Sequence, residues 1–182
     1  MRMKWIVLPV LAAAAATALG VSLASARTSA QNATVKAFMS ERFAVNRYFQ
    51  EGMRFSPGTV AVASGGTLTF EYGDKEMDPH TLTIVSKADL PKTVAQVENC
   101  RSCQRYATPH LKHPKAEPGP SNPIVHWVLN EGQPGLDTVG DSLAIQPGAH
   151  KQISVKVTAP AGTTLYFICA VHPWMQGKIV VR

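Results

Sequence analysis

Residues 169–175 read Cys-Ala-Val-His-Pro-Trp-Met and are the most informative part of this sequence. The Cys169 thiol, the His172 imidazole and the Met175 thioether follow one another at intervals of three residues. The β-prone run Leu165–Cys169 precedes them and Gly177 opens a second such run, so we predict a short loop between two neighbouring strands. A loop this short can bring its three side chains around one point.

The three side chains are typical donors of a soft metal site. A thiolate, a thioether and an imidazole together suit copper better than calcium or magnesium, which prefer oxygen. Zinc accepts cysteine and histidine but seldom uses methionine. A further donor must come from another strand, and His80 is the best candidate because it opens an alternating run. Two histidines, a cysteine and an axial methionine are the ligands of a blue-copper electron-transfer site.

Short β-prone runs separated by turns occupy much of the remaining chain. These runs are Thr59–Ala63, Thr67–Tyr72, His80–Val85, Ile153–Val157, Leu165–Cys169 and Lys178–Arg182. No long helical period is visible, so we predict an all-β Greek-key sandwich. The segment 27–54 is less clear, because Ala37–Gln50 fits either a short helix or a first strand. The main domain is therefore predicted over residues 55–182.

A loop-rich insertion is predicted at about residues 87–137. This part of the chain is rich in Pro, Gly, Asn and charged residues, and the stretch Glu117–Pro123 contains three prolines. Only Ile124–Leu129 looks like a strand. A long structureless stretch is unusual inside a compact domain, which indicates a functional or covalently stapled insertion.

The sequence resembles the cupredoxins, and within them the amicyanin and plastocyanin group. The matching pieces are Phe55-Ser56-Pro57, Pro79-His80, Pro147-Gly148, Tyr166–Cys169, and Cys169-x-x-His172-x-x-Met175 with Gly177-Lys178-Ile179. They lie within roughly residues 50–86 and 138–182. The resemblance implies a cupredoxin-like β-sandwich that holds one type 1 copper ion and carries electrons to and from other proteins.

Two residues depart from the family pattern. Thr81 stands where many members have an asparagine that braces the copper loop through hydrogen bonds. Ala170 stands where a hydroxyl residue often follows the cysteine. Both positions concern the surroundings of the metal, which tune its properties, and not the predicted ligands His80, Cys169, His172 and Met175.

The N-terminus is predicted to be a signal peptide, residues 1–26. A basic start, Met1–Lys4, precedes the apolar run Trp5–Leu23 and a small-residue cleavage site, Ala24–Ala26. An uncleaved membrane anchor is the alternative, and both place the domain in the periplasm or outside the cell. The whole chain has a net charge of +6, without the dense basic run that is typical of nucleic-acid binding.

Three cysteines are present, Cys100, Cys103 and Cys169. In an oxidising compartment the first two are expected to form a disulfide, which leaves Cys169 to be explained by metal binding. Two alternatives remain open for the pair: a second metal site with His110 and His113, or a redox-active dithiol.

We expect the chain to carry single electrons through the copper ion rather than to act as an enzyme, because the predicted centre has no open position for a substrate. The residues Val171, His172, Pro173 and Trp174 are predicted to form the surface where a redox partner protein docks transiently; ordinary packing of Trp174 is the alternative. Copper storage or delivery is the rival function, with Cys100, Cys103 and Met77 as extra soft ligands.

Overall fold

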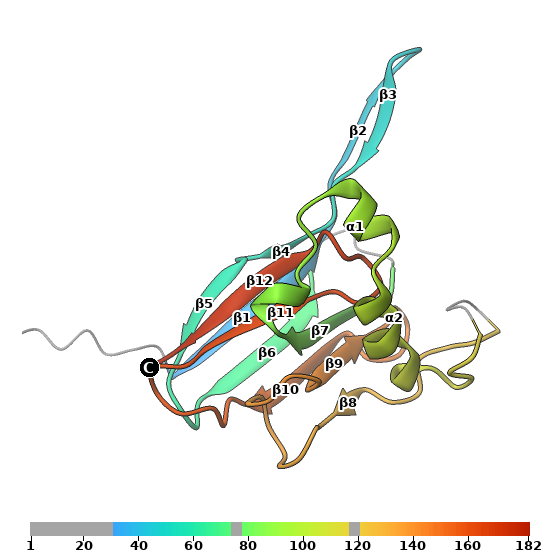
Figure 1. Cartoon of the computed structure of the whole chain (residues 1–182). Coiled ribbons are helices and arrows are strands. Elements are labelled where there is room, and N and C mark those ends of the chain that lie inside the picture. The colour runs from blue at the N-terminus through green and yellow to red at the C-terminus, as the bar shows by residue number, and fades with distance from the viewer. Residues whose placement is uncertain (1–30, 74–77, 117–120) are drawn as a thin grey trace, which may run out of the picture.

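The computed structural model describes residues 31–73, 78–116 and 121–182 (Figure 1). The predicted signal peptide and Met77 lie outside the described residues. Within these three ranges, no helix combines the length and the apolar composition needed to cross a membrane.

Two β-sheets form the body of the molecule. One sheet has four strands in the order β10-β6-β1-β4, and the other has six in the order β5-β12-β11-β7-β9-β8. The strands are β1 (Asn32–Phe38), β2 (Glu41–Ala44), β3 (Tyr48–Glu51), β4 (Arg54–Ser56), β5 (Thr59–Val62), β6 (Thr67–Tyr72), β7 (His80–Val85), β8 (Val128–Leu129), β9 (Ser142–Ile145), β10 (Gln152–Lys156), β11 (Thr164–Ile168) and β12 (Gln176–Val181).

The core lies between the two sheets. Alternate residues of each strand point inward, so Phe70 and Leu68 from one sheet meet Phe167 and Ile179 from the other. Phe55 bridges the layers: its ring centroid lies 6.0 Å from that of Phe70 and 4.9 Å from that of Phe167. The predicted all-β sandwich is confirmed.

The segment that was unclear in the sequence is part of the sandwich. Strand β1 lies between β4 and β6, and it pairs in parallel with β6. The described sandwich therefore begins at Asn32, upstream of the expected start at Phe55. The hairpin β2–β3 follows and projects beyond the body (Figure 1).

The insertion carries short helices rather than one long loop. The helical segments are η1 (Lys87–Asp89), α1 (Val94–Glu98), α2 (Arg101–Ala107) and η2 (Thr108–His110). The strand expected over Ile124–Leu129 is confined to β8, although Ile124 forms an isolated bridge with Leu111.

The insertion covers the outer face of the six-stranded sheet over β7, β9 and β11. Cys103 of α2 packs with Val85 and Ile168, and Leu111 packs with Ala144. Strand β7 is consequently buried along its whole length, whereas its alternating sequence predicts one solvent-facing side. This third layer places polar side chains of β7 in the interior.

One end of the sandwich gathers the predicted metal ligands. Strand β7 begins at His80 and pairs antiparallel with β11, which ends at Ile168. The beginning of an antiparallel strand lies beside the end of its neighbour, so His80 is brought to the loop that starts at Cys169.

Candidate metal centre

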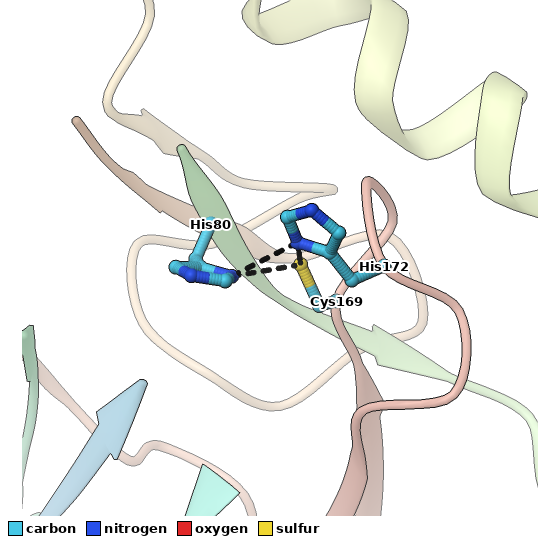
Figure 2. Close-up of side chains that lie close together, drawn as sticks. All are labelled: His80, Cys169 and His172. Carbon is cyan, nitrogen blue, oxygen red and sulfur yellow. Dashed lines mark hydrogen bonds between the residues drawn. The ribbon is translucent and has the colours of Figure 1, made fainter. Parts of the chain in front are cut away.

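Three predicted ligands converge on one point (Figure 2). His80 Nδ1 and His172 Nδ1 are 3.1 Å apart. Cys169 Sγ lies 3.6 Å from the first of these nitrogens and 3.7 Å from the second. Two imidazoles and a thiol thus face one another, although His80 is 89 residues away from Cys169 in the sequence.

The spacing of these donors fits a single metal ion. Donors bound about 2.0–2.3 Å from one ion, at mutual angles of about 110–120°, lie roughly 3.3–3.7 Å apart. The three measured separations, 3.1, 3.6 and 3.7 Å, are close to this range. Two nitrogen donors with one sulfur donor suit copper or zinc and exclude calcium and magnesium, which prefer oxygen ligands.

Met175 belongs to the same loop and is buried beside Cys169 in the main core. The Met175 N–H donates to His172 O at 2.9 Å, and the Cys169 N–H donates to Met175 O at 3.0 Å. These two backbone hydrogen bonds close the loop on itself and hold its two ends together. The Met175 side chain is therefore held in the same buried cluster as the Cys169 thiol, and 1% of the residue is exposed.

Thr81, which stands where many cupredoxins have an asparagine, braces the loop. Its backbone N–H donates to Cys169 Sγ at 3.4 Å. Its side-chain Oγ1 accepts from the Ala170 N–H at 2.8 Å. Cys169 and the next residue, Ala170, are thereby both tied to strand β7, so a threonine at this position also supplies a hydrogen-bonded link between the strand and the loop.

The surroundings of Cys169 favour its thiolate form. Burial raises the pKa of this thiol, but hydrogen bonds from His172 and His80 and the charges of their rings lower it more, to about 5. The thiolate is the form that binds soft metals. In the metal-free protein, the thiol is therefore ionised at neutral pH.

The two histidines differ in their access to solvent. His80 is fully buried, and its ring packs edge-on against Tyr72 with 6.1 Å between centroids. His172 is half-buried, and its ring centroid lies 5.3 Å from that of Trp174, which is 50% exposed. His172 is thus the ligand nearest the surface, and Val171 and Pro173 beside it are also half-buried.

Cys100 and Cys103 form a disulfide with 5.2 Å between their Cα atoms. Their sulfurs are thereby occupied, which argues against a second metal site at this pair. His110 is turned away from it, because its ring nitrogens contact Ser142 Oγ and His126 O. Among the described residues, the group formed by His80, Cys169 and His172 is the one cluster with metal-binding geometry.

Sequence reasoning missed the polar side chains that support the loop from the outer face of the six-stranded sheet. Thr83, Ser142 and His110 continue the hydrogen bonding of Thr81 away from the metal centre. The alternation of β7 places Thr81 and Thr83 on one face, but no local pattern links them to Ser142 or His110, which lie far along the chain.

No family model and no curated protein matches the chain. Among solved structures, the purple cupredoxin of Nitrosopumilus maritimus is 11% identical, with a TM-score of 0.42 over 82% of this chain and 99% of that one. Auracyanin A of Chloroflexus aurantiacus is 22% identical, with a TM-score of 0.39 over 71% and 89%. The plastocyanin of Dryopteris crassirhizoma is 16% identical, with a TM-score of 0.35 over 72% and 90%.

The architecture and the site agree with the resemblance seen in the sequence. The two-sheet body places a buried thiol, two imidazoles and a thioether at one end, from one strand and one loop. The cluster of His80, Cys169, His172 and Met175 matches a type 1 copper site in a cupredoxin-like β-sandwich.

Proposed function

We propose that this chain carries single electrons through one type 1 copper ion held by His80, Cys169, His172 and Met175. The observation that carries the proposal is the convergence of His80 Nδ1, Cys169 Sγ and His172 Nδ1 within 3.7 Å of one another. When bound, copper supplies a one-electron Cu(II)/Cu(I) couple. Four protein donors leave no open position for a substrate, which favours an electron carrier over an enzyme.

The role of the protein is to keep the donors in place while the charge of the ion changes. The backbone bonds between Cys169, His172 and Met175 restrain the loop. The Thr81 N–H, which donates to Cys169 Sγ, and Thr81 Oγ1, which accepts from the Ala170 N–H, restrain the same loop from the strand side. A site held from two directions reorganises little between oxidation states, which favours rapid transfer.

Electrons are proposed to enter and leave through His172. This residue is the more exposed of the two histidines, and Val171, Pro173 and Trp174 surround it on the same loop. The half-exposed Trp174 ring offers an apolar contact to a redox partner protein. Such encounters are small and transient, because a carrier must release its partner after each transfer.

We propose further that residues 1–26 act as a signal peptide and that the domain works in the periplasm or outside the cell. The basic start and the apolar run that follows it support export. The Cys100–Cys103 disulfide is independent support, because disulfides persist in oxidising compartments and are rare in the cytosol.

Copper delivery is the rival function, and the disulfide weakens it. A delivery protein releases Cu(I) through accessible soft ligands that exchange one at a time. Cys100 and Cys103 are bonded to each other, and Cys169 is fully buried. The described soft donors therefore favour retention of the ion.

The test of the ligand set is the visible spectrum of the copper-loaded protein. A Cu(II)–thiolate centre has an intense visible band, so the protein should be coloured. Cys169→Ser should abolish the band, while Met175→Leu should keep it and shift the reduction potential, because the axial ligand tunes that potential. A band that survives in Cys169→Ser would refute the assignment.

The test of carrier against delivery protein is retention of Cu(I). The wild type should give a reversible one-electron wave over many cycles and should lose no copper to a Cu(I) chelator of moderate affinity. The matched control replaces both Cys100 and Cys103 by serine and should behave in the same way. Rapid loss of Cu(I) from the wild type, abolished in the double variant, would favour delivery.

A further inference from the structure

Buried polar side chains form a hydrogen-bond chain that runs from the metal loop into the insertion. Thr81 and Thr83 lie on the outer side of β7, and Ser142 lies directly opposite Thr83 on β9. The Thr83 hydroxyl donates to Thr81 Oγ1 at 3.1 Å and lies 2.6 Å from Ser142 Oγ. Ser142 Oγ in turn lies 2.7 Å from His110 Nε2. Every member of this chain is at most 1% exposed.

His110 ends this hydrogen-bond chain of side chains and belongs to the insertion. It closes the short helix η2, and the next residue, Leu111, packs with Ile124 and Ala144 on this face of the sheet. Without the insertion, Thr83 and Ser142 would face solvent. The three hydroxyls contact one another, but the Ser142 hydrogen needs an acceptor outside them, because a buried donor without a partner destabilises the fold. His110 Nε2 is the atom within its reach.

The ring orientation of His110 is determined on its other side. His110 Nδ1 lies 2.5 Å from His126 O, and a carbonyl oxygen can only accept, so Nδ1 carries a hydrogen. Burial lowers the pKa of His110, which favours the neutral ring. A neutral ring with its hydrogen on Nδ1 presents a lone pair at Nε2, and the Ser142 hydroxyl donates to it.

This arrangement fixes the hydroxyls that follow. Ser142 directs its hydrogen to His110, so its oxygen is left to accept from Thr83 at 2.6 Å. The Thr83 hydrogen is then shared between Ser142 Oγ and Thr81 Oγ1, and this holds the Thr81 side chain in one orientation. That orientation aims Thr81 Oγ1 at the Ala170 N–H, next to the thiol.

We propose that His110 is a positioning residue of the metal centre, acting on Cys169 through Ser142, Thr83 and Thr81. The inference rests on the proposed electron-transfer function only for its effect on the reduction potential. The hydrogen bond from the Thr81 N–H withdraws electron density from the thiolate and so disfavours the more positive Cu(II) ion. When the hydrogen-bond chain is broken, Thr81 Oγ1 holds the Ala170 N–H less firmly, so the loop that carries Cys169 Sγ is less restrained against β7. The bond from the Thr81 N–H to Sγ then weakens and the potential falls.

The experiment compares His110→Leu, Ser142→Ala and the variant that carries both changes. Each single variant should shift the reduction potential downward. The double variant should shift it no further than the larger single effect, because both changes interrupt the same hydrogen-bond chain. His113→Leu is the matched control, since His113 lies in the same insertion but is exposed, and it should leave the potential unchanged. Ser142→Ala keeps the test valid if His110→Leu does not fold.

A second measurement uses the metal-free protein and does not depend on copper. Amide hydrogen exchange at Ala170 should be faster in Ser142→Ala and His110→Leu than in the wild type, and unchanged in His113→Leu. Unchanged exchange at Ala170 in both Ser142→Ala and His110→Leu would overturn the proposal. Faster exchange with an unaltered potential would also overturn it, because His110 would then be structural only.

The two measurements separate this inference from the proposed function. A wild type without a reversible wave would refute electron transfer. The exchange rates of Ala170 would then still decide whether His110 positions the loop through Ser142.

Discussion

Replacing Thr81 by valine removes one hydroxyl from the support of the metal loop and little else. Valine has nearly the same shape as threonine, so the packing of β7 is kept. The backbone N–H that donates to Cys169 Sγ is also kept. What is lost is the acceptor of the Ala170 N–H, at 2.8 Å, together with the acceptor of the Thr83 hydroxyl, at 3.1 Å.

The expected cost follows from the burial of these groups. Thr81 is 1% exposed and Ala170 is 6% exposed, so water does not replace the lost acceptor. A buried N–H left without a partner destabilises a protein by about 1–3 kcal/mol. For a domain of this size, each kcal/mol lowers the melting temperature by about 2–4 °C, so Thr81→Val should lower it by about 2–12 °C.

The assay is urea unfolding of the metal-free protein, supported by thermal unfolding. Thr69→Val is the matched control, because the Thr69 hydroxyl contacts Ser154 Oγ at 2.8 Å on the exposed side of its sheet, where water can replace it. The control should change the free energy of unfolding by less than about 0.5 kcal/mol. An equal effect of the two substitutions, or none in Thr81→Val, would refute the bracing role of Thr81.

Three further predictions concern other parts of the molecule. In the metal-free protein, ultraviolet absorbance should show Cys169 ionising near pH 5, because the histidine contacts outweigh burial; a midpoint near pH 9 would contradict this. Since folding lowers this pKa, the free energy of unfolding should rise between pH 5 and pH 9, and its loss on acidification should be absent in Cys169→Ser. Gly177→Ala should destabilise the fold by about 1–3 kcal/mol, because a Cβ there overlaps the buried Phe167 ring; an unchanged melting temperature would show that this contact is not tight. Thiol counting on denatured protein should find one free thiol, and replacing both Cys100 and Cys103 by serine should cost about 2 kcal/mol; three free thiols would exclude the disulfide.

The sequence alone determined the loop and the kind of metal it suits. Cys169, His172 and Met175 lie within seven residues, and their donor atoms have strong chemical preferences. The strand pattern was likewise readable, because alternation and turn residues act over short distances. His80 was predicted as the remote ligand from its place at the start of a strand, with the family resemblance as support.

Only the tertiary structure decided how distant segments meet. The pairing of β7 with β11 brings His80 to the loop, and parallel pairing with β6 draws β1 into the sandwich, upstream of the expected start. The insertion looked irregular because its helices are short, and helices of this length are stabilised by packing rather than by propensity. The same packing turns Thr81 and Thr83 from solvent-facing residues into buried ones that meet Ser142 and His110. Such contacts depend on which surfaces the topology places together, and local sequence patterns do not encode that placement.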